Sequence, residues 1–163
     1  MKSAPVLFGV DVLDLRRVAG AVRRNGAVYT RHVVAADEHD LSTGDDISIA
    51  ATVAVKESLV KAVGGRPSGF SWHDFVHRDG EPPAAVARLL TDAVPGIATA
   101  IGVELTESRT YAVRGASRAA VLHRSGAGDP GETSVVGAAR WGRRHEVIVA
   151  LAILVTISAK ESS

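Results

Sequence analysis

The hydrophobic pattern of the chain changes between strand-like and helix-like periods from one segment to the next. Residues 5–13 are rich in valine and leucine and end at a polar position, which predicts a strand. Asp14 follows where a helix N-cap is expected. The apolar positions of the next segment recur at helical spacing, at Leu15, Val18 and Val22. We therefore expect a helix up to about Arg24 that ends at Asn25-Gly26, because glycine tolerates the left-handed conformation of helix C-termini.

Further segments predict helices at residues 47–63, 84–94 and 115–128. The first of these begins near Asp46, and the glycines and proline of residues 64–67 end it. The second follows Pro82-Pro83, since proline is favoured at the start of a helix. The third is short and is closed by glycines. Residues 37–46 are polar and acidic and predict a loop or a short helical turn.

Strands are predicted in the remaining apolar segments, at residues 70–78, 101–105, 110–114, 132–141 and 145–158. The first of them ends in a turn at Asp79-Gly80, and the last two form a β-hairpin around Gly142–Arg144. The second arm of this hairpin contains the longest apolar run, Val147–Ile157. It is shorter than the roughly 20 residues that a membrane helix needs, so we expect a buried strand.

Composition limits the number of domains and the kinds of partner. The 163 residues fit one domain, which we expect over residues 1–158, followed by a disordered tail over residues 159–163. Lysine and arginine number 19 against 18 aspartates and glutamates, so no global field attracts the protein to nucleic acid or to a membrane. The absence of cysteine excludes disulfides and thiolate chemistry and agrees with a cytoplasmic location.

Charged residues interrupt two of the apolar segments. Lys56, Glu57 and Lys61 lie within the alanine- and valine-rich helix, where charge is unfavourable unless it is used or paired. Glu57 and Lys61 share one helical face, so an exposed ion pair is the simpler interpretation. Asp11 interrupts an otherwise apolar face of the first strand. Two carboxylates from separate elements beside a lysine indicate a candidate site for a hard cation and a phosphate.

Two histidines in the stretch HDFVH, His73 and His77, would share a side in either a helix or a strand. No glutamate stands in the His-Glu-x-x-His position and no third ligand is evident, so ordinary half-exposed histidines are favoured over a zinc site. Aromatic residues make up only 4% of the chain, which leaves few surfaces for stacking nucleic-acid bases.

Three stretches resemble the signatures of a known family. GVDVLDLRRV, RHVVAADE and VAVKESLVKAVG are similar to the N-terminal signatures of the holo-acyl-carrier-protein synthases, the small 4′-phosphopantetheinyl transferases. SWHDFV, VRGASRAAVLHRSGAG and RRHEVIVALAILV continue the resemblance more loosely. It implies an α+β fold of the phosphopantetheinyl transferase type, with an antiparallel sheet packed on a long central helix, and a homotrimer with active sites between subunits.

The resemblance also implies a reaction and its residues. The family transfers 4′-phosphopantetheine from coenzyme A (CoA) to a serine of an acyl or peptidyl carrier protein, with Mg²⁺, for fatty acid or polyketide biosynthesis. Asp11 and Glu57 would bind the metal, Glu57 and Lys61 would be catalytic, and Lys56 and Lys61 would contact the phosphates of CoA. Four arginines of the first helix would dock the acidic helix of the carrier protein, namely Arg16, Arg17, Arg23 and Arg24. A solvated helix face is the alternative interpretation of these arginines.

The chain departs from the family pattern at two places. Many members carry Ser-Leu-Ser-His before the final strand, but Ala139–Gly142 contains no histidine here, and His145 is the candidate that would replace it as a catalytic residue. The connection around residues 80–110 is longer than usual and is interpreted as an insertion. These departures motivate an alternative function. In it, a repurposed relative has lost transfer and acts on, or binds, a biosynthetic intermediate or a carrier protein.

Overall fold

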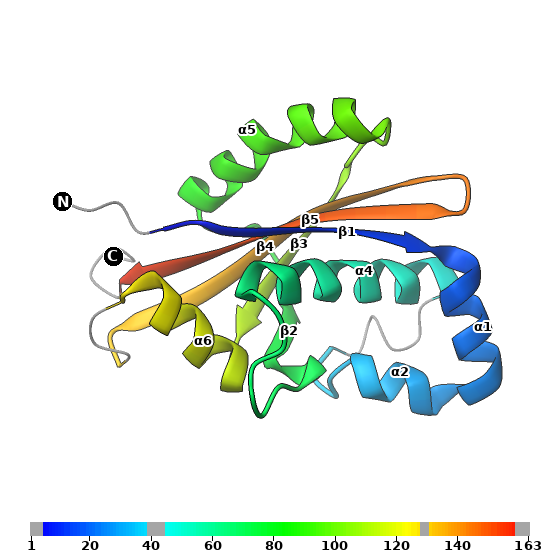
Figure 1. Cartoon of the computed structure of the whole chain (residues 1–163), viewed down its shortest axis with the longest axis horizontal. Coiled ribbons are helices and arrows are strands. Elements are labelled where there is room, and N and C mark those ends of the chain that lie inside the picture. Colours follow the sequence, from blue (N-terminus) through cyan, green and yellow to red (C-terminus); the bar gives the residue numbers. More distant parts are fainter. Residues whose placement is uncertain (1–4, 39–44, 128–130, 159–163) are drawn as a thin grey trace.

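The computed structural model describes residues 5–38, 45–127 and 131–158 and contains one antiparallel sheet in the order β1-β5-β4-β3-β2. The strands are β1 (Leu7–Asp14), β2 (Phe75–Arg78), β3 (Glu107–Val113), β4 (Thr133–Arg144) and β5 (Val147–Ser158). The helices are α1 (Leu15–Asn25), α2 (Ala27–Val33), α4 (Asp46–Val63), α5 (Ala84–Ile101), α6 (Gly115–Ser125) and the 3-10 turn η1 (Trp72–Asp74). Helix α4 runs along one face of the sheet and α5 lies over the other face (Figure 1). This arrangement confirms the expected α+β fold class.

Capping residues set the ends of α1, which follows the strand that carries Asp11, and of α4, which contains Glu57. Asp14 caps α1 by accepting a hydrogen bond from the N–H of Arg16 at 2.9 Å. Asp45 caps α4 in the same way through the N–H of Ser48 at 2.8 Å. Gly64 ends α4 in the left-handed conformation, with φ of 99°, as the sequence predicts.

A close backbone approach brings strand β1 against helix α4. A side chain at Gly9 would collide with the backbone of α4 at Ser58, so only glycine allows the two elements to lie this close. The face of β1 that carries Gly9 and Asp11 therefore packs on α4, while Phe8 and Val12 on the opposite face are exposed. Asp11 is thus held beside the charged positions of α4.

The segment interpreted from the sequence as an insertion contains helix α5, which continues past the predicted end at residue 94. It passes through Pro95 to Ile101, and Ile97, beyond the proline, still packs against the hydrophobic cluster on the sheet. By length and composition α5 is apolar enough to cross a membrane. Its buried residues nevertheless join Leu151 and neighbouring sheet residues in a hydrophobic cluster. The strand predicted at residues 101–105 is wrong: Gly102 ends α5, and residues 103–105 form no strand, although Val103 and Leu105 are buried.

Other elements also differ from the sequence predictions. Helix α2 has no predicted counterpart, and β3 begins at Glu107 rather than at residue 110. Strand β2 begins only at Phe75, because a capping box between Ser71 and Asp74 forms the turn η1 ahead of it. The β4–β5 hairpin is confirmed, but β4 continues to Arg144 and β5 begins only at Val147, so the turn falls after Arg144 rather than at residues 142–144. The tail predicted over residues 159–163 lies outside the described residues.

Candidate functional site

The structure places both candidate metal ligands, Asp11 and Glu57, on one cleft. It has a volume of about 280 Å³ and is enclosed by β1, α1, α2 and α4. It is lined by Asp11, Val12, Leu13, Arg17, Val18, Ala21, Arg24, Tyr29, His32, Val33, Val53, Glu57 and Trp72. We call it the acid cleft. The fold therefore brings two carboxylates from distant positions in the chain, 11 and 57, to one shared surface.

Asp11 is paired with a lysine of the central helix. Its carboxylate Oδ1 lies 2.8 Å from Nζ of Lys61, and only 9% of the residue is exposed. The same ammonium donates to the carbonyl oxygen of Val10 at 3.1 Å, while about half of the lysine side chain, 53%, stays in solvent. Lys61, which is not itself among the residues lining the acid cleft, therefore holds a half-exposed positive charge next to a nearly buried carboxylate.

Glu57 is paired with an arginine from the loop after α4. Its Oε1 lies 3.4 Å from Nη2 of Arg66, and the Glu57–Lys61 pair considered from spacing alone is not formed. Each of the two candidate metal ligands thus has a cation of the protein beside it. Since Arg66 belongs to no predicted site, the sequence reasoning missed it, and no local pattern indicates its contact with Glu57.

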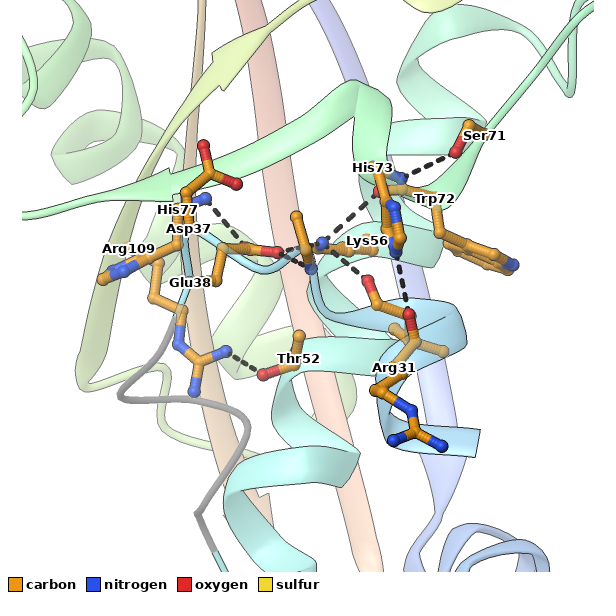
Figure 2. A network of polar contacts seen from close by, with 12 residues as sticks. Arg31, Asp37, Glu38, Thr52, Lys56, Ser71, Trp72, His73, His77 and Arg109 are labelled. Atoms are coloured by element: carbon orange, nitrogen blue, oxygen red, sulfur yellow. Dashed lines mark hydrogen bonds and ion pairs between the residues drawn. The ribbon is translucent and has the colours of Figure 1, made fainter. Parts of the chain in front are cut away.

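Lys56 points away from the acid cleft and is entirely buried. Its ammonium donates to Oε2 of Glu38 at 2.7 Å, to the carbonyl of Val33 at 2.8 Å and to the carbonyl of Trp72 at 3.3 Å (Figure 2). Burial lowers the pKa of Lys56, and the charge of Glu38 opposes this shift. The ammonium has three oxygen partners and no exposed surface, so it is not available to contact a phosphate as the resemblance led us to expect. Lys56 has a structural role instead.

Glu38, the partner of Lys56, is a buried structural residue to which the sequence assigned no role. It closes the RHVVAADE signature, and its carboxylate also accepts the N–H groups of Ala35 at 2.7 Å and His77 at 2.8 Å. One buried carboxylate thereby joins the end of α2 to β2. The glutamate at the end of the signature could have been recognised as a candidate residue from the sequence. Its pairing with Lys56, which is 18 positions away, follows only from the fold.

The four arginines of α1 line two different clefts. Arg17 and Arg24 line the acid cleft. Arg16 and Arg23 line a separate cleft of about 210 Å³, and Arg16 is also paired with Asp14 at 3.1 Å. Two arginines therefore face the acids and two face away from them.

His145 lies outside the acid cleft of its own chain. It occupies the exposed β4–β5 turn with φ of 54° and is not among the residues that line the cleft. Gly142 stands in the stretch where the resemblance leads us to expect a histidine, and a side chain at this position would collide with the carbonyl oxygen of Glu104. The close contact with residues 104–105 therefore favours glycine at position 142.

Three further residues of the acid cleft, Tyr29, His32 and Trp72, were not predicted. The first two come from α2, the helix that the sequence reasoning missed. Burial raises the pKa of Tyr29; the positive charge of Arg17 opposes the shift and the negative charge of Glu57 adds to it. Tyr29 is therefore expected to remain a neutral phenol beside the acids at neutral pH.

The donor set of the acid cleft fits a hard cation that needs few protein ligands. Among the described residues, no group of three or more His, Cys, Asp or Glu side chains could hold a metal ion. His73 and His77 do not form a zinc site there: Nε2 of His73 lies 2.9 Å from the carbonyl oxygen of Arg31, and the ring of His77 packs on Tyr111. Two carboxylates fit Mg²⁺, which commonly keeps water and takes substrate phosphate oxygens as further ligands.

Comparison with known proteins shows the family. The chain is 42% identical over 99 residues to the holo-[acyl-carrier-protein] synthase of Clavibacter sepedonicus, which covers 59% of this chain and 76% of that protein. It is 36% identical over 100 residues to the protein of the same name from Micrococcus luteus, covering 58% and 72% of the two chains. No family model matches the chain. The chain belongs to the holo-[acyl-carrier-protein] synthase family, a family of transferases, and is a divergent member.

Solved structures agree on the fold. The holo-[acyl-carrier-protein] synthase of Helicobacter pylori, solved in complex with coenzyme A, matches with a TM-score of 0.57 at 15% identity and covers 91% of this chain and 99% of that one. The holo-ACP-synthase of Plasmodium yoelii matches with a TM-score of 0.58 at 14% identity, over 94% and 98% of the two chains. The family fold therefore extends over nearly the whole chain.

Proposed function

We propose that this protein transfers 4′-phosphopantetheine from CoA to a serine of an acyl or peptidyl carrier protein, with Mg²⁺. The observation that carries this proposal is the acid cleft, where Asp11 and Glu57 from separate elements line one surface and each has a cation beside it. Relatives at up to 42% identity are named holo-[acyl-carrier-protein] synthases, and a structural relative was solved with CoA. Both support the same substrates.

The reaction requires charge neutralisation and alignment more than covalent help from the protein. The serine oxygen attacks the β-phosphorus of CoA, the bond from that phosphorus to the oxygen bridging to the α-phosphate breaks, and 3′,5′-ADP leaves as the serine proton is lost. Asp11 and Glu57 would hold Mg²⁺, which when bound neutralises the diphosphate. Lys61, already anchored on Asp11 at 2.8 Å, presents its ammonium to the diphosphate.

Carrier recognition is assigned to the arginines of α1. Carrier proteins present an acidic helix to the enzymes of this family, and a basic helix beside the cleft supplies the complementary charge. Arg17 and Arg24 line the acid cleft and would meet the carrier near its serine, while Arg16 and Arg23 would extend the contact outward.

We infer a homotrimer in the cytoplasm, as the family resemblance implies. The exposed apolar side chains of β1, Phe8 and Val12, support a subunit interface, because such residues are usually covered in an assembly. His145 is retained as a catalytic candidate only for a trimer in which the exposed β4–β5 turn of one subunit meets the acid cleft of another.

A test of transfer incubates the protein with CoA, Mg²⁺ and a panel of apo carrier proteins, and measures the intact mass of each carrier. The proposal expects at least one carrier to gain the mass of phosphopantetheine. If no carrier gains this mass while the metal is present in the reaction, the transfer proposal is contradicted.

The packing of Glu104 on Gly142 favours one alternative, a relative that has lost transfer. In this alternative the protein acts on, or binds, a biosynthetic intermediate or a carrier protein. Calorimetry separates the two functions. A transferase should bind CoA in a magnesium-dependent manner and lose this dependence in Glu57→Gln. The alternative predicts no binding heat for CoA, with or without Mg²⁺, in either the unaltered protein or Glu57→Gln.

A further inference from the structure

The two candidate metal ligands are each paired with a cation of the protein, and the two cations are held in different ways. Lys61 is fixed by Asp11 itself, at 2.8 Å, and by the carbonyl oxygen of Val10 at 3.1 Å. Arg66 meets Glu57 at 3.4 Å, which is long for a charge-assisted hydrogen bond. The contact with Glu57 is therefore not what holds the guanidinium of Arg66 in place.

Aromatic rings hold the guanidinium of Arg66. Its central carbon lies 4.8 Å from the ring centroid of Trp72 and 5.4 Å from that of Phe70, which is within the range of cation–π attraction. The two rings pack edge to face, with centroids 5.3 Å apart. Trp72 is anchored in turn, since its carbonyl oxygen accepts a hydrogen bond from the buried Lys56 at 3.3 Å (Figure 2). The positive charge of Arg66 is thus fixed beside Glu57 by contacts that do not depend on the carboxylate.

The surroundings of the two candidate metal ligands carry no excess of negative charge. The lining of the acid cleft includes Arg17 and Arg24 as well as the two carboxylates. Lys61 and Arg66 lie outside this lining and place two more positive charges directly beside the carboxylates. A free divalent cation that enters the acid cleft therefore meets repulsion from the protein's own cations as well as attraction from its acids.

We propose that Arg66 competes with the divalent cation for Glu57 and thereby keeps the affinity of the free protein for the cation low. The inference rests on the proposed function for the metal site, and on the stacked guanidinium for the competitor. Like charges beside one carboxylate repel each other, and Arg66 cannot withdraw without losing its contacts with the aromatic rings. A cation that arrives with an anionic ligand brings compensating negative charge. The protein therefore favours binding of the two together over binding of the cation alone.

The test is equilibrium binding of Mn²⁺ to the full chain, without CoA and without a carrier protein. Mn²⁺ takes the place of Mg²⁺ because carboxylate and water ligands suit both ions, and the electron paramagnetic resonance signal of Mn²⁺ measures the free ion directly. The matched control for Arg66→Gln is Arg31→Gln, because Arg31 is exposed and lines a neighbouring cleft together with Arg66. We expect Arg66→Gln to bind Mn²⁺ about fivefold or more tightly than both the unaltered protein and Arg31→Gln. Equal affinities in the two variants would overturn the inference.

A double variant tests whether Arg66 acts through Glu57. In a Glu57→Gln background the carboxylate for which the two cations compete is gone, so Arg66→Gln should no longer tighten Mn²⁺ binding. An equal gain in affinity in both backgrounds would indicate a general effect of charge and would overturn the competition. Since 55% of the Arg66 side chain is exposed, variants at this position should keep the fold.

The outcomes separate this inference from the proposed function. No measurable Mn²⁺ binding by Arg66→Gln would contradict the metal site and overturn the inference with it. Equal Mn²⁺ affinities in a protein that still transfers phosphopantetheine to a carrier would overturn the inference alone. If Arg66→Gln binds Mn²⁺ more tightly but the unaltered protein modifies no carrier, the inference stands and transfer is contradicted.

Discussion

Nζ of Lys56 lies 2.7 Å from Oε2 of Glu38, and neither side chain has any exposed surface. The pair joins the end of α2, the following loop, η1 and β2 to the central helix. Val33 and Trp72, whose carbonyl oxygens accept from Lys56, also line the acid cleft. The two neighbouring residues Lys56 and Glu57 thus have different roles: Lys56 supports the wall of the acid cleft, and Glu57 lines its interior.

Removal of the Lys56 ammonium should destabilise the fold strongly. Lys56→Met leaves the carboxylate of Glu38 buried without its cation, for which we expect a loss of about 3–5 kcal/mol in the free energy of unfolding. Lys61→Met removes a half-exposed partner and is expected to lose about 1 kcal/mol or less. Denaturant unfolding measures both. Equal stabilities of the two variants would contradict the structural role of Lys56.

A double variant separates loss of the pair from general damage to the core. Lys56→Met combined with Glu38→Gln removes the charge that the single substitution leaves unpaired. It should therefore be more stable than Lys56→Met alone. A double variant that is less stable than the single one would mean that the unpaired charge is not the cause of the loss.

The N-cap carboxylates of α1 and α4 should make the free energy of unfolding depend on pH in the acidic range. Hydrogen bonds from Arg16 lower the pKa of Asp14, and the N–H of Ser48 lowers the pKa of Asp45, both from 3.8. A lowered folded-state pKa gives stability that is complete above the unfolded value and is lost as pH falls through the folded one. Asp14→Asn and Asp45→Asn should therefore lose less stability than the unaltered protein between about pH 5 and pH 2. Identical pH profiles would contradict this role, and Asp92→Asn on α5 serves as the control.

The contact between the insertion and the hairpin can be tested at Gly142. Gly142→Ala places a methyl group against the carbonyl of Glu104 and should destabilise the protein by about 1–3 kcal/mol. The matched control is Gly96→Ala within α5, where a Cβ meets nothing within 4 Å and alanine is favoured by about 0.5–1 kcal/mol. Thermal unfolding should separate the two variants in opposite directions. A higher unfolding temperature for Gly142→Ala than for the unaltered protein would mean that residues 104–105 do not pack closely against Gly142.

Carrier docking should depend on Arg17, one of the two arginines that line the acid cleft. Arg17→Ala is expected to raise KM for the carrier protein about fivefold, the effect of about 1 kcal/mol from an exposed charge, and to leave KM for CoA unchanged. Steady-state kinetics with each substrate varied in turn measures both values, with Arg88→Ala as the control. An unchanged KM for the carrier, or a rise in KM for CoA alone, would remove Arg17 from the docking surface.

Much of the fold follows from local patterns, and much of the site does not. The cap at Asp14, the length of α4 and the β4–β5 hairpin are written in residues close together in sequence, so periodicity and turn chemistry predict them. The same reasoning identified Asp11 and Glu57 as unusual because each interrupts an apolar face. It ended α5 too early because Pro95 breaks the local pattern, while packing against the sheet continues the helix. The partners of the acids and of Lys56 arise from contacts between separate elements, which no local spacing specifies.

The central claim is that Asp11 and Glu57 hold the reaction at the acid cleft. Its most direct test is the intact mass of an apo carrier protein after incubation with CoA and Mg²⁺, using the unaltered protein and Glu57→Gln side by side. The account predicts that the carrier gains the mass of phosphopantetheine with the unaltered protein, and that Glu57→Gln lowers the rate of this gain by about 100-fold or more. Equal rates of mass gain with the two proteins would contradict it.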